Sequence, residues 1–446
     1  MLPSIQRARR GGFSLASGSL LLAGLVFVVA IDGFSAMARA ESLAQALQRT
    51  LAFNPSINAE REKLRAVDEG YDIAGAGYRP NITVNGDVTR QNILTDLNSG
   101  IQTEDTTTSR GYSVNISQPL YRGGRTVAAL SEAEANSLAA REALRNVEQN
   151  TLLEVATTYV AIVRDTAIRK LRKNDLRVLG KQLNATIGRQ QAGVVTTTDV
   201  ALARSRKSAA RSELTIANAN LNTARAEYIR LTGRAASKLR YPLVRGKLPA
   251  ATLNAAIKIG RNENPSVLAA FFARDAAKFA IDKVRGERLP QLSLEAGYDR
   301  RWDGSQTIEQ QRSANIKLRG TVPLYQGGAV IARTRQARAT YRQKSLEITA
   351  AEANARSKTV SSWSDMVAAK ARISSAATQV EAAQKALLGI SNEEKVGQRT
   401  VLDVLDAEQE LLSAKVAAQQ ARGDFITAYF RLLTAMGRFR SGSGIY

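Results

Sequence analysis

The chain has 446 residues, contains neither cysteine nor histidine, and carries a net charge of +23 at pH 7. The lack of cysteine excludes a disulfide framework and thiolate metal sites, and the lack of histidine removes the commonest general base and metal ligand. Because 44% of the residues are hydrophobic but only 5% are aromatic, the composition favours long helices packed side by side over a bulky core.

The first forty residues have the pattern of a cleaved secretion signal. Three arginines among the first ten residues precede an apolar run from Leu20 to Ala30, and Ala38-Arg39-Ala40 provides a small-x-small cleavage site. The apolar run is short for a membrane anchor. We therefore expect a mature chain that begins near Glu41 and leaves the bacterial cytoplasm.

The positive charge is not the charge of a nucleic-acid-binding protein. The basic residues are spread along the helix-prone segments and are not clustered with aromatic ones. Secretion also removes most nucleic-acid partners. A solvated helix surface that can face anionic lipid is the better interpretation.

Short helices are predicted at the start of each half of the chain. Residues 42–53 have an amphipathic pattern, and Asn54-Pro55 begins a second helix that can run to about Tyr78. Asn264-Pro265 begins a matching helix that ends near Leu289-Pro290.

Alternation of apolar and polar residues then predicts four strands. For example, Val114 and Ile116 alternate with Ser113 and Asn115. Strand length and pattern are typical of membrane-barrel strands, although a half-buried sheet in a soluble protein produces the same alternation. The expected strands cover residues 81–90, 111–119, 291–300 and 314–323.

Each pair of strands is followed by a long helical hairpin. Long segments without proline carry seams of apolar residues spaced by three and four, as in a coiled coil. Glycines at Gly193 and Gly397 break these segments, and the return helices end at Gly233 and Gly437. We expect the hairpins over 126–232 and 329–436.

A motif that joins strand to helix occurs twice. Gln118-Pro119-Leu120-Tyr121-Arg122-Gly123-Gly124 returns as Val322-Pro323-Leu324-Tyr325-Gln326-Gly327-Gly328. Proline cannot donate to a sheet ladder, and paired glycines permit unusual backbone angles. The motif therefore predicts a corner at which a strand leaves the sheet and a long helix begins. Pro119, Gly123, Gly124, Pro323, Gly327 and Gly328 are the expected corner residues.

A constant offset indicates that the chain is duplicated. Pro119 and Pro323 lie 204 positions apart, and the same offset relates Gly193 to Gly397. The expected organisation is a signal peptide at 1–40, a first repeat at 41–233, a linker at 234–251, a second repeat at 252–437 and a flexible tail at 438–446.

Helix lengths and strand number together limit the architecture. Helix 126–188 spans roughly 95 Å, close to the sum of helices 55–78 and 199–232, which can therefore stack end to end beside it. After the signal, no apolar run is long enough for a membrane helix. Four strands cannot close a barrel, and an unclosed sheet leaves its edges unsatisfied in lipid, so the strands must come from several chains. A dimer with eight strands and a trimer with twelve both remain open at this point.

The chain resembles the TolC family of outer-membrane efflux and secretion channels over residues 41–437. The duplicated corner carries the resemblance, together with the turn from Gly193 to Asp199-Val200 and the segment Val396-Gly397-Gln398-Arg399-Thr400-Val401-Leu402-Asp403-Val404-Leu405-Asp406. It implies a mixed α/β membrane protein in the outer membrane of a Gram-negative bacterium. Four transmembrane strands per chain would contribute to a twelve-stranded barrel in a homotrimer, continued into the periplasm by a long α-helical barrel of coiled-coil hairpins.

The function implied by the resemblance is passage, without catalysis, cofactor or metal. The channel would be the exit duct of a tripartite efflux pump or a type I secretion system for drugs, toxic compounds or proteins. A periplasmic adaptor (membrane fusion) protein would join it to an inner-membrane transporter. The alternative is a soluble periplasmic coiled-coil adaptor, which usually has one hairpin and further domains that are absent here. An enzyme is the weakest reading, because only carboxylates such as Asp403 and Asp406 remain for acid–base work.

The resemblance also assigns roles to the hairpin tips. Asp199 and Arg399 match charged partners that hold the periplasmic entrance closed, and Asp403 and Asp406 match acidic residues that ring the constriction and favour cations. Helix capping is the alternative role for Asp199 and Asp403. Glu394 stands where the family often has a tyrosine. The expected adaptor-docking residues are Gly193, Val194, Thr196, Gly397 and Thr400.

Overall fold

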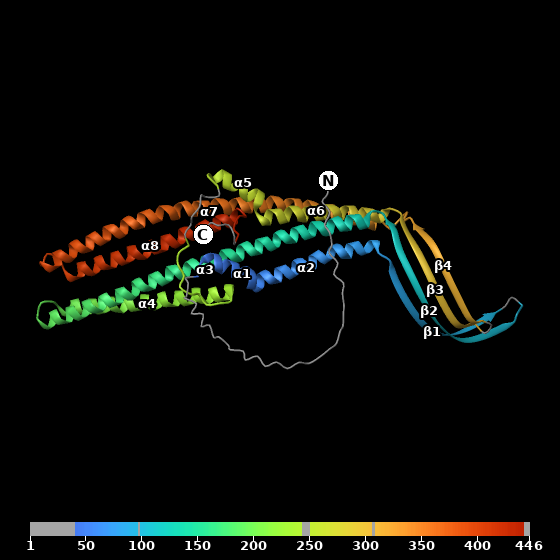
Figure 1. Ribbon diagram of the computed structural model, residues 1–446, viewed down its shortest axis with the longest axis horizontal. Coiled ribbons are helices and arrows are strands. Elements are labelled where there is room, and N and C mark those ends of the chain that lie inside the picture. Colours follow the sequence, from blue (N-terminus) through green and yellow to red (C-terminus); the bar gives the residue numbers. More distant parts are fainter. Residues whose placement is uncertain (1–40, 97–98, 243–249, 306–307, 441–446) are drawn as a thin grey trace, which may run out of the picture. The chain divides into compact units, whose positions relative to one another are not determined.

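The computed structural model describes residues 41–96, 99–242, 250–305 and 308–440. The expected signal peptide and the last six residues of the expected tail lie outside these ranges. Among the helices within them, none combines the length and apolarity that a membrane-crossing helix needs. Figure 1 shows the strands at one end of two long helices and the turns to their return helices at the other.

The two repeats contain the same elements in the same order. The first has α1 (Leu43–Phe53), α2 (Pro55–Gly75), the 3-10 turn η1 (Ala76–Tyr78), β1 (Asn81–Asp96), β2 (Gln102–Arg122), α3 (Arg125–Gln191) and α4 (Thr197–Thr232). The second has α5 (Leu253–Glu263), α6 (Pro265–Arg285), η2 (Gly286–Arg288), β3 (Gln291–Ser305), β4 (Ile308–Thr321), α7 (Ala329–Lys395) and α8 (Val401–Ala435).

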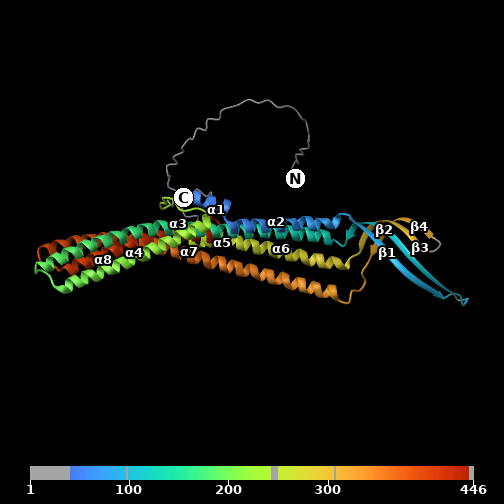
Figure 2. The same cartoon turned by 90° about the horizontal axis from the view of Figure 1, so that it is seen from below.

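The long helices α3 and α7 are each flanked along their length by two shorter ones. Both have 67 residues, or about 100 Å at 1.5 Å per residue. α4 and α2 lie end to end beside α3, and α8 and α6 lie end to end beside α7 (Figures 1 and 2). The stacking of half-length helices against a full-length one is therefore present in both repeats.

One asparagine side chain joins the two short helices in each repeat. The Asn54 side chain caps α2 by accepting from the backbone N–H of Ser56 and Ile57, while its Nδ2 donates to the Leu231 carbonyl at 3.1 Å. Asn264 repeats this at α6, where its Nδ2 donates to the Ala435 carbonyl at 2.9 Å. Each asparagine therefore satisfies orphan groups at the start of one helix and at the end of another, with little exposure to water.

The strands form one antiparallel sheet in the order β1-β2-β3-β4. Residues that face each other across it share a side, so its register sorts the alternating residues into an apolar face and a polar face. One apolar row contains Val84, Val114, Tyr298 and Ala314. The adjacent polar row contains Asn85, Ser113, Asp299 and Ser313.

Four of the strand bounds differ markedly from the expectation. β1 continues to Asp96 and β2 begins at Gln102, because residues 91–96 and 102–110 continue the ladder instead of forming a loop. β3 continues to Ser305, five residues beyond the expected end, and β4 begins at Ile308, six residues before the expected start. A polar sequence hides such segments, since alternation is visible only where one face is apolar.

The two corners differ in how the strand ends. β2 passes Pro119 through an irregularity in its register and continues to Arg122, whereas β4 ends at Thr321, before the second proline. The glycines behave alike, since all four have positive φ and Gly124 and Gly328 precede the long helices at φ 72° and 76°. At Gly123 the backbone approach is also close, because an added Cβ would lie 2.3 Å from the Gly286 carbonyl oxygen.

The main core lies where the short helices meet the long ones. Tyr159 and Phe430 are fully buried there, and Trp363 packs against the same cluster. The expectation of a flexible tail from residue 438 is wrong for its first residues, because Phe439 is buried 5.2 Å from the Phe430 ring. Part of the linker also packs inward, since Tyr241 contacts this core.

We predict that Asn264→Ala lowers the thermal stability of the protein. The substitution removes a helix cap and leaves the buried Ala435 carbonyl without its donor, a loss of about 1–3 kcal/mol. Thermal unfolding followed by circular dichroism measures it. The control is Asn220→Ala at an exposed position within α4, and an equal Tm for both variants would show that the junction does not depend on the asparagine.

Candidate functional site

The two hairpin tips have the same backbone conformation. Gly193 and Gly397 have φ of 77° and 79°, which lets the chain reverse directly after α3 and α7. The residue after each glycine then donates back into the preceding helix, from Val194 N to the Arg189 carbonyl and from Gln398 N to the Glu393 carbonyl, both at 2.9 Å. Sequence duplication thus produces two closely matching tips.

A capping box begins each return helix. The Thr196 hydroxyl accepts from the Asp199 backbone N–H at 3.2 Å, and the Asp199 carboxylate accepts from the Thr196 N–H at 2.9 Å. Thr400 and Asp403 repeat this arrangement. Hydrogen bonds from the two threonines hold the pKa of both carboxyls below its ordinary value. The N-cap is therefore the threonine in each case, and the aspartate is the third residue of the helix.

Arg399 pairs with a carboxylate of its own hairpin. Its Nε lies 2.9 Å from Glu393 Oε2, and this hydrogen bond is the main reason why the pKa of Arg399 is raised. Among the described residues of one chain, no ion pair joins Arg399 to Asp199. The expected pairing of these two residues is thus not made within a single chain.

Two ion pairs connect the two hairpins near their tips. Arg189 of α3 lies 2.7 Å from Glu394 of α7, and Arg206 of α4 lies 2.5 Å from Asp406 of α8. Sequence reasoning named Glu394 and Asp406 but missed both arginines. A signal was available for the first pair only, since Arg189 and Glu394 stand at nearly equivalent positions of the two repeats, whereas Arg206 and Asp406 do not.

Apolar contacts and two carboxyl groups lie further from the tips. Leu179, Ala210 and Leu405 form a small core that brings together α3, α4 and α8. Near it, Glu408 has a buried Oε2 with no hydrogen-bond partner among the described residues. Burial raises the pKa of Glu408, and Asp175 of the other hairpin raises it further. Burial also raises the pKa of Asp175, against the opposing effect of Arg172.

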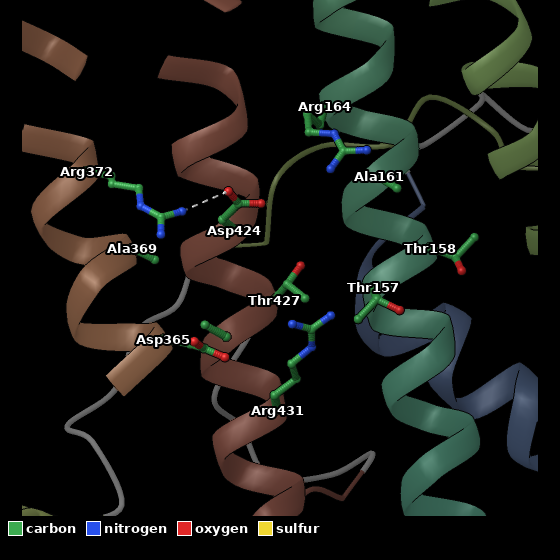
Figure 3. A pocket seen from close by; sticks show the side chains of 11 residues that line it. Thr157, Thr158, Ala161, Arg164, Asp365, Ala369, Arg372, Asp424, Thr427 and Arg431 are labelled. Carbon is green, nitrogen blue, oxygen red and sulfur yellow. Dashed lines mark ion pairs between the residues drawn. The ribbon is translucent and has the colours of Figure 1, made fainter. Parts of the chain in front are cut away.

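A polar cavity of about 460 Å³ lies between α3, α7 and α8 (Figure 3). Three arginines and two aspartates line it, and Arg372 and Asp424 are 3.8 Å apart. Arg164 is held by Asp165 at 2.8 Å. The cavity offers charges of both signs and threonine hydroxyls, a lining suited to ions or polar solutes. Within the described part of the chain no cluster of acidic residues has the arrangement of a metal site.

Comparison with known proteins identifies the relatives of the chain. A model of the outer membrane efflux protein family matches residues 46–234 and 257–438. The outer membrane efflux protein BepC of Brucella suis is 31% identical over 425 residues, which cover 95% of this chain and 90% of BepC. The outer membrane protein TolC of Salmonella enteritidis is 26% identical and covers 92% of this chain and 84% of its own length.

The fold has close matches among solved structures. The outer membrane channel CmeC of Campylobacter jejuni aligns with a TM-score of 0.79 over 92% of this chain and 88% of its own, at 14% sequence identity. These matches exclude the soluble adaptor and agree with an exit duct that lies in the outer membrane and extends into the periplasm. The chain belongs to the outer membrane efflux protein family, the TolC-like channels that its corner and tip motifs indicate.

Proposed function

We propose that three copies of this chain close into one channel, the exit duct of a tripartite efflux pump. The three sheets form a twelve-stranded barrel in the outer membrane, and the helices continue it as a periplasmic tunnel. An adaptor joins the tunnel to an inner-membrane transporter. The chain conducts solutes and catalyses nothing; the efflux role in the name of BepC supports this use.

One interface is the main support for this proposal. The chain forms it once, between its own two repeats, and presents the equivalents of both sides of that interface again at the two edges of its sheet. β2 and α3 pack against β3 and α6 of the second repeat. β4 and α7 are the equivalents of β2 and α3, and β1 and α2 are the equivalents of β3 and α6. Because β1 and β4 are the sheet edges, these surfaces are available to the next copy. A heterologous interface of this kind closes into a ring when the rotation between neighbouring copies divides a full turn.

Ring size follows from the lumen. About eight strands give a barrel just wide enough for its own side chains, whereas twelve leave space for a passage. The corner glycines also support a repeated interface. Gly123 lies against Gly286, whereas no atom lies within 4 Å of a Cβ at Gly327. In the ring, Gly327 would face the matching turn at Ala76 of the next copy.

The tips would form the periplasmic gate. Asp199, Arg399, Asp403 and Asp406 remain the proposed gate and constriction residues, and Asp199 and Arg399 would meet between neighbouring copies. Arg189–Glu394 and Arg206–Asp406 would hold the two hairpins of each copy together. Three copies bring six carboxylates from Asp403 and Asp406 near one axis, which favours cations.

The adaptor would dock on the exposed turns. Gly193, Val194, Thr196, Gly397 and Thr400 form these turns, and the Val194 side chain is 72% exposed. An exposed valine beside a glycine gives an apolar contact on a surface with little steric hindrance. This arrangement suits the tip of a partner's helical hairpin.

We expect the wild-type protein to conduct poorly in planar lipid bilayers, and we predict that Arg189→Glu increases this conductance roughly two- to tenfold. The substitution replaces an attraction between the hairpins with repulsion from Glu394. The double variant Arg189→Glu/Glu394→Arg should restore low conductance.

The matched control is Glu213→Gln, which breaks an ion pair with Arg172 inside one hairpin and should leave the conductance unchanged. An equal increase in this control would assign the effect to general loosening. A protein that remains a soluble monomer and never enters outer membranes would refute the proposed channel.

Replacing Asp403 and Asp406 with asparagine should reduce the preference for cations. The reversal potential in a KCl gradient measures this preference, and loss of these carboxylate charges near the axis should shift it toward zero. Asp403→Asn alone should shift it in the same direction and leaves the Arg206–Asp406 pair intact. The control is Glu410→Gln, one helix turn further along α8. An unchanged reversal potential in the double variant would place the selectivity filter elsewhere.

We predict that Glu408→Gln raises the Tm at pH 7.5 and that this gain shrinks as the pH falls. The raised pKa of Glu408 means that its ionised form destabilises the fold at neutral pH, and protonation removes that penalty. A glutamine amide can also donate to Asp175. Melting curves between pH 7.5 and 4.5 test this, and a gain that is independent of pH would contradict it.

A further inference from the structure

Four arginines lie on the apolar face of the sheet, on the side away from the corners. Arg300 and Arg312 face each other across β3 and β4 in the row that also contains Tyr112. Arg110 lies in the next row, and Arg90 in the row beyond it. Because opposite residues share a face and alternate residues return to it, Arg90, Arg110, Arg300 and Arg312 project from the same side as Val84 and Val114. We call these four the outer arginine group.

The outer arginine group is next to a cluster of aromatic rings. Tyr112 lies 6.2 Å from Tyr298 and 6.0 Å from Trp302, measured between ring centroids. The Arg300 guanidinium stacks over the Trp302 ring at 4.5 Å. Tyrosine and tryptophan gather where a hydrocarbon layer ends and polar headgroups begin. The aromatic cluster therefore marks an interface level on the apolar face, and the arginines stand at this level and just beyond it.

The position along the strands fits the far boundary of a membrane. From Pro119 to Arg110 the strand rises roughly 30 Å at 3.3 Å per residue, and a tilt of about 40° reduces this to roughly 23 Å. The apolar band of outer-membrane barrels is about 25 Å tall. Since the corners lead into the periplasmic helices, the outer arginine group lies at the external surface.

In the rows of the outer arginine group the charges on this face are largely unbalanced, and the carboxylates Glu104 and Asp96 follow on the same face only two and three rows beyond Arg90. Arg110 is 3.8 Å from Asp303, and Arg312 donates to the Gln310 side chain at 3.3 Å. Arg90 and Arg300 have no ion pair among the described residues, and the Arg300 Nε is buried without a hydrogen-bond acceptor. No carboxylate shares this face in the rows from Ile82 to Arg90.

The polar face at the same height carries charges of both signs. Asp87 and Arg301 meet across Gly111 at 3.3 Å, and Asp299 lies in the next polar row toward the corners. Arginines that only extend their guanidinium groups into water would not require the two faces to differ in charge balance. The excess positive charge is confined to the face that lipid would cover.

We propose that the outer arginine group binds the phosphate groups of a phosphorylated lipid in the outer leaflet, with its acyl chains against the apolar rows below. The proposal rests on the proposed trimeric barrel, which assigns the apolar face to lipid. Guanidinium groups match phosphate oxygens with paired, charge-assisted hydrogen bonds. Arg300, held over Trp302, is already oriented, so less side-chain entropy is lost when it binds.

Titration of the purified full-length protein with lipid A tests the proposal. Native mass spectrometry in mild detergent counts bound lipid, using diphosphorylated lipid A and the dephosphorylated form as probes. We expect wild-type protein to prefer the diphosphorylated lipid, and R110Q/R300Q/R312Q to lose roughly tenfold or more of that affinity.

The matched control is R301Q, which removes one arginine from the opposite face of the same strand and should change the affinity less than twofold. The single variant R300Q lies on the interior strand β3. It should lose severalfold and carries the test if the triple variant does not assemble. Excess inorganic phosphate should not displace the lipid.

Three results would overturn the lipid site: equal binding of both lipids, equal loss in R301Q, or displacement by free phosphate. Conductance in phosphatidylcholine bilayers is read separately. A triple variant that conducts normally but no longer prefers the phosphorylated lipid supports the site, whereas a wild-type protein that forms no pore refutes the channel itself.

Discussion

The contact between the two repeats of one chain is the constraint on which the rest of the structure depends. Hydrogen bonds between β2 and β3 join the two halves of the sheet, and α3 packs along α6 below them. Where Gly123 and Gly286 meet, each carbonyl oxygen lies within 2.5 Å of the place where the other residue would carry a Cβ. Only glycine allows this approach, so the internal corner sets the distance at which the strands and helices of the two repeats of one chain can continue together.

Much of this architecture could be predicted from the sequence, because its signals are local. Asn54-Pro55 and Asn264-Pro265 indicate helix starts, and the glycines at 193 and 397 indicate reversals. The longer course of β1 and β2 could not be predicted, because those segments are mostly polar and show no alternation, with Ile93 and Leu94 adjacent to each other. The burial of Phe439 could not be predicted either, because it depends on a contact with Phe430 of α8 that forms only when the residues after that helix pack against it.

At the hairpin tips, motifs predict where charged residues lie but not which partners they bind. Asp199 and Asp403 were correctly located at helix starts, but their hydrogen bonds go to Thr196 and Thr400, three residues earlier. Arg189 and Arg206 were missed because an ion pair between two hairpins depends on how the hairpins lie side by side. Charges at matching heights in two repeats suggest such pairs, but only packing selects which of several neighbours are joined.

The interactions at the two ends of the long helices α3 and α7 differ in strength, and each suits a different function. An exposed ion pair such as Arg206–Asp406 contributes at most about 1 kcal/mol, because water and salt compete for both partners. In the proposed trimer, six pairs of this kind would add up to a few kcal/mol, an amount that a docking partner could supply. The corner cannot be switched in this way, since backbone ladders and the close glycines leave no alternative arrangement of similar energy. The proposed channel has to stay sealed in its membrane and to open at its entrance. It therefore has rigid backbone contacts at the corners and weak side-chain pairs at the hairpin tips.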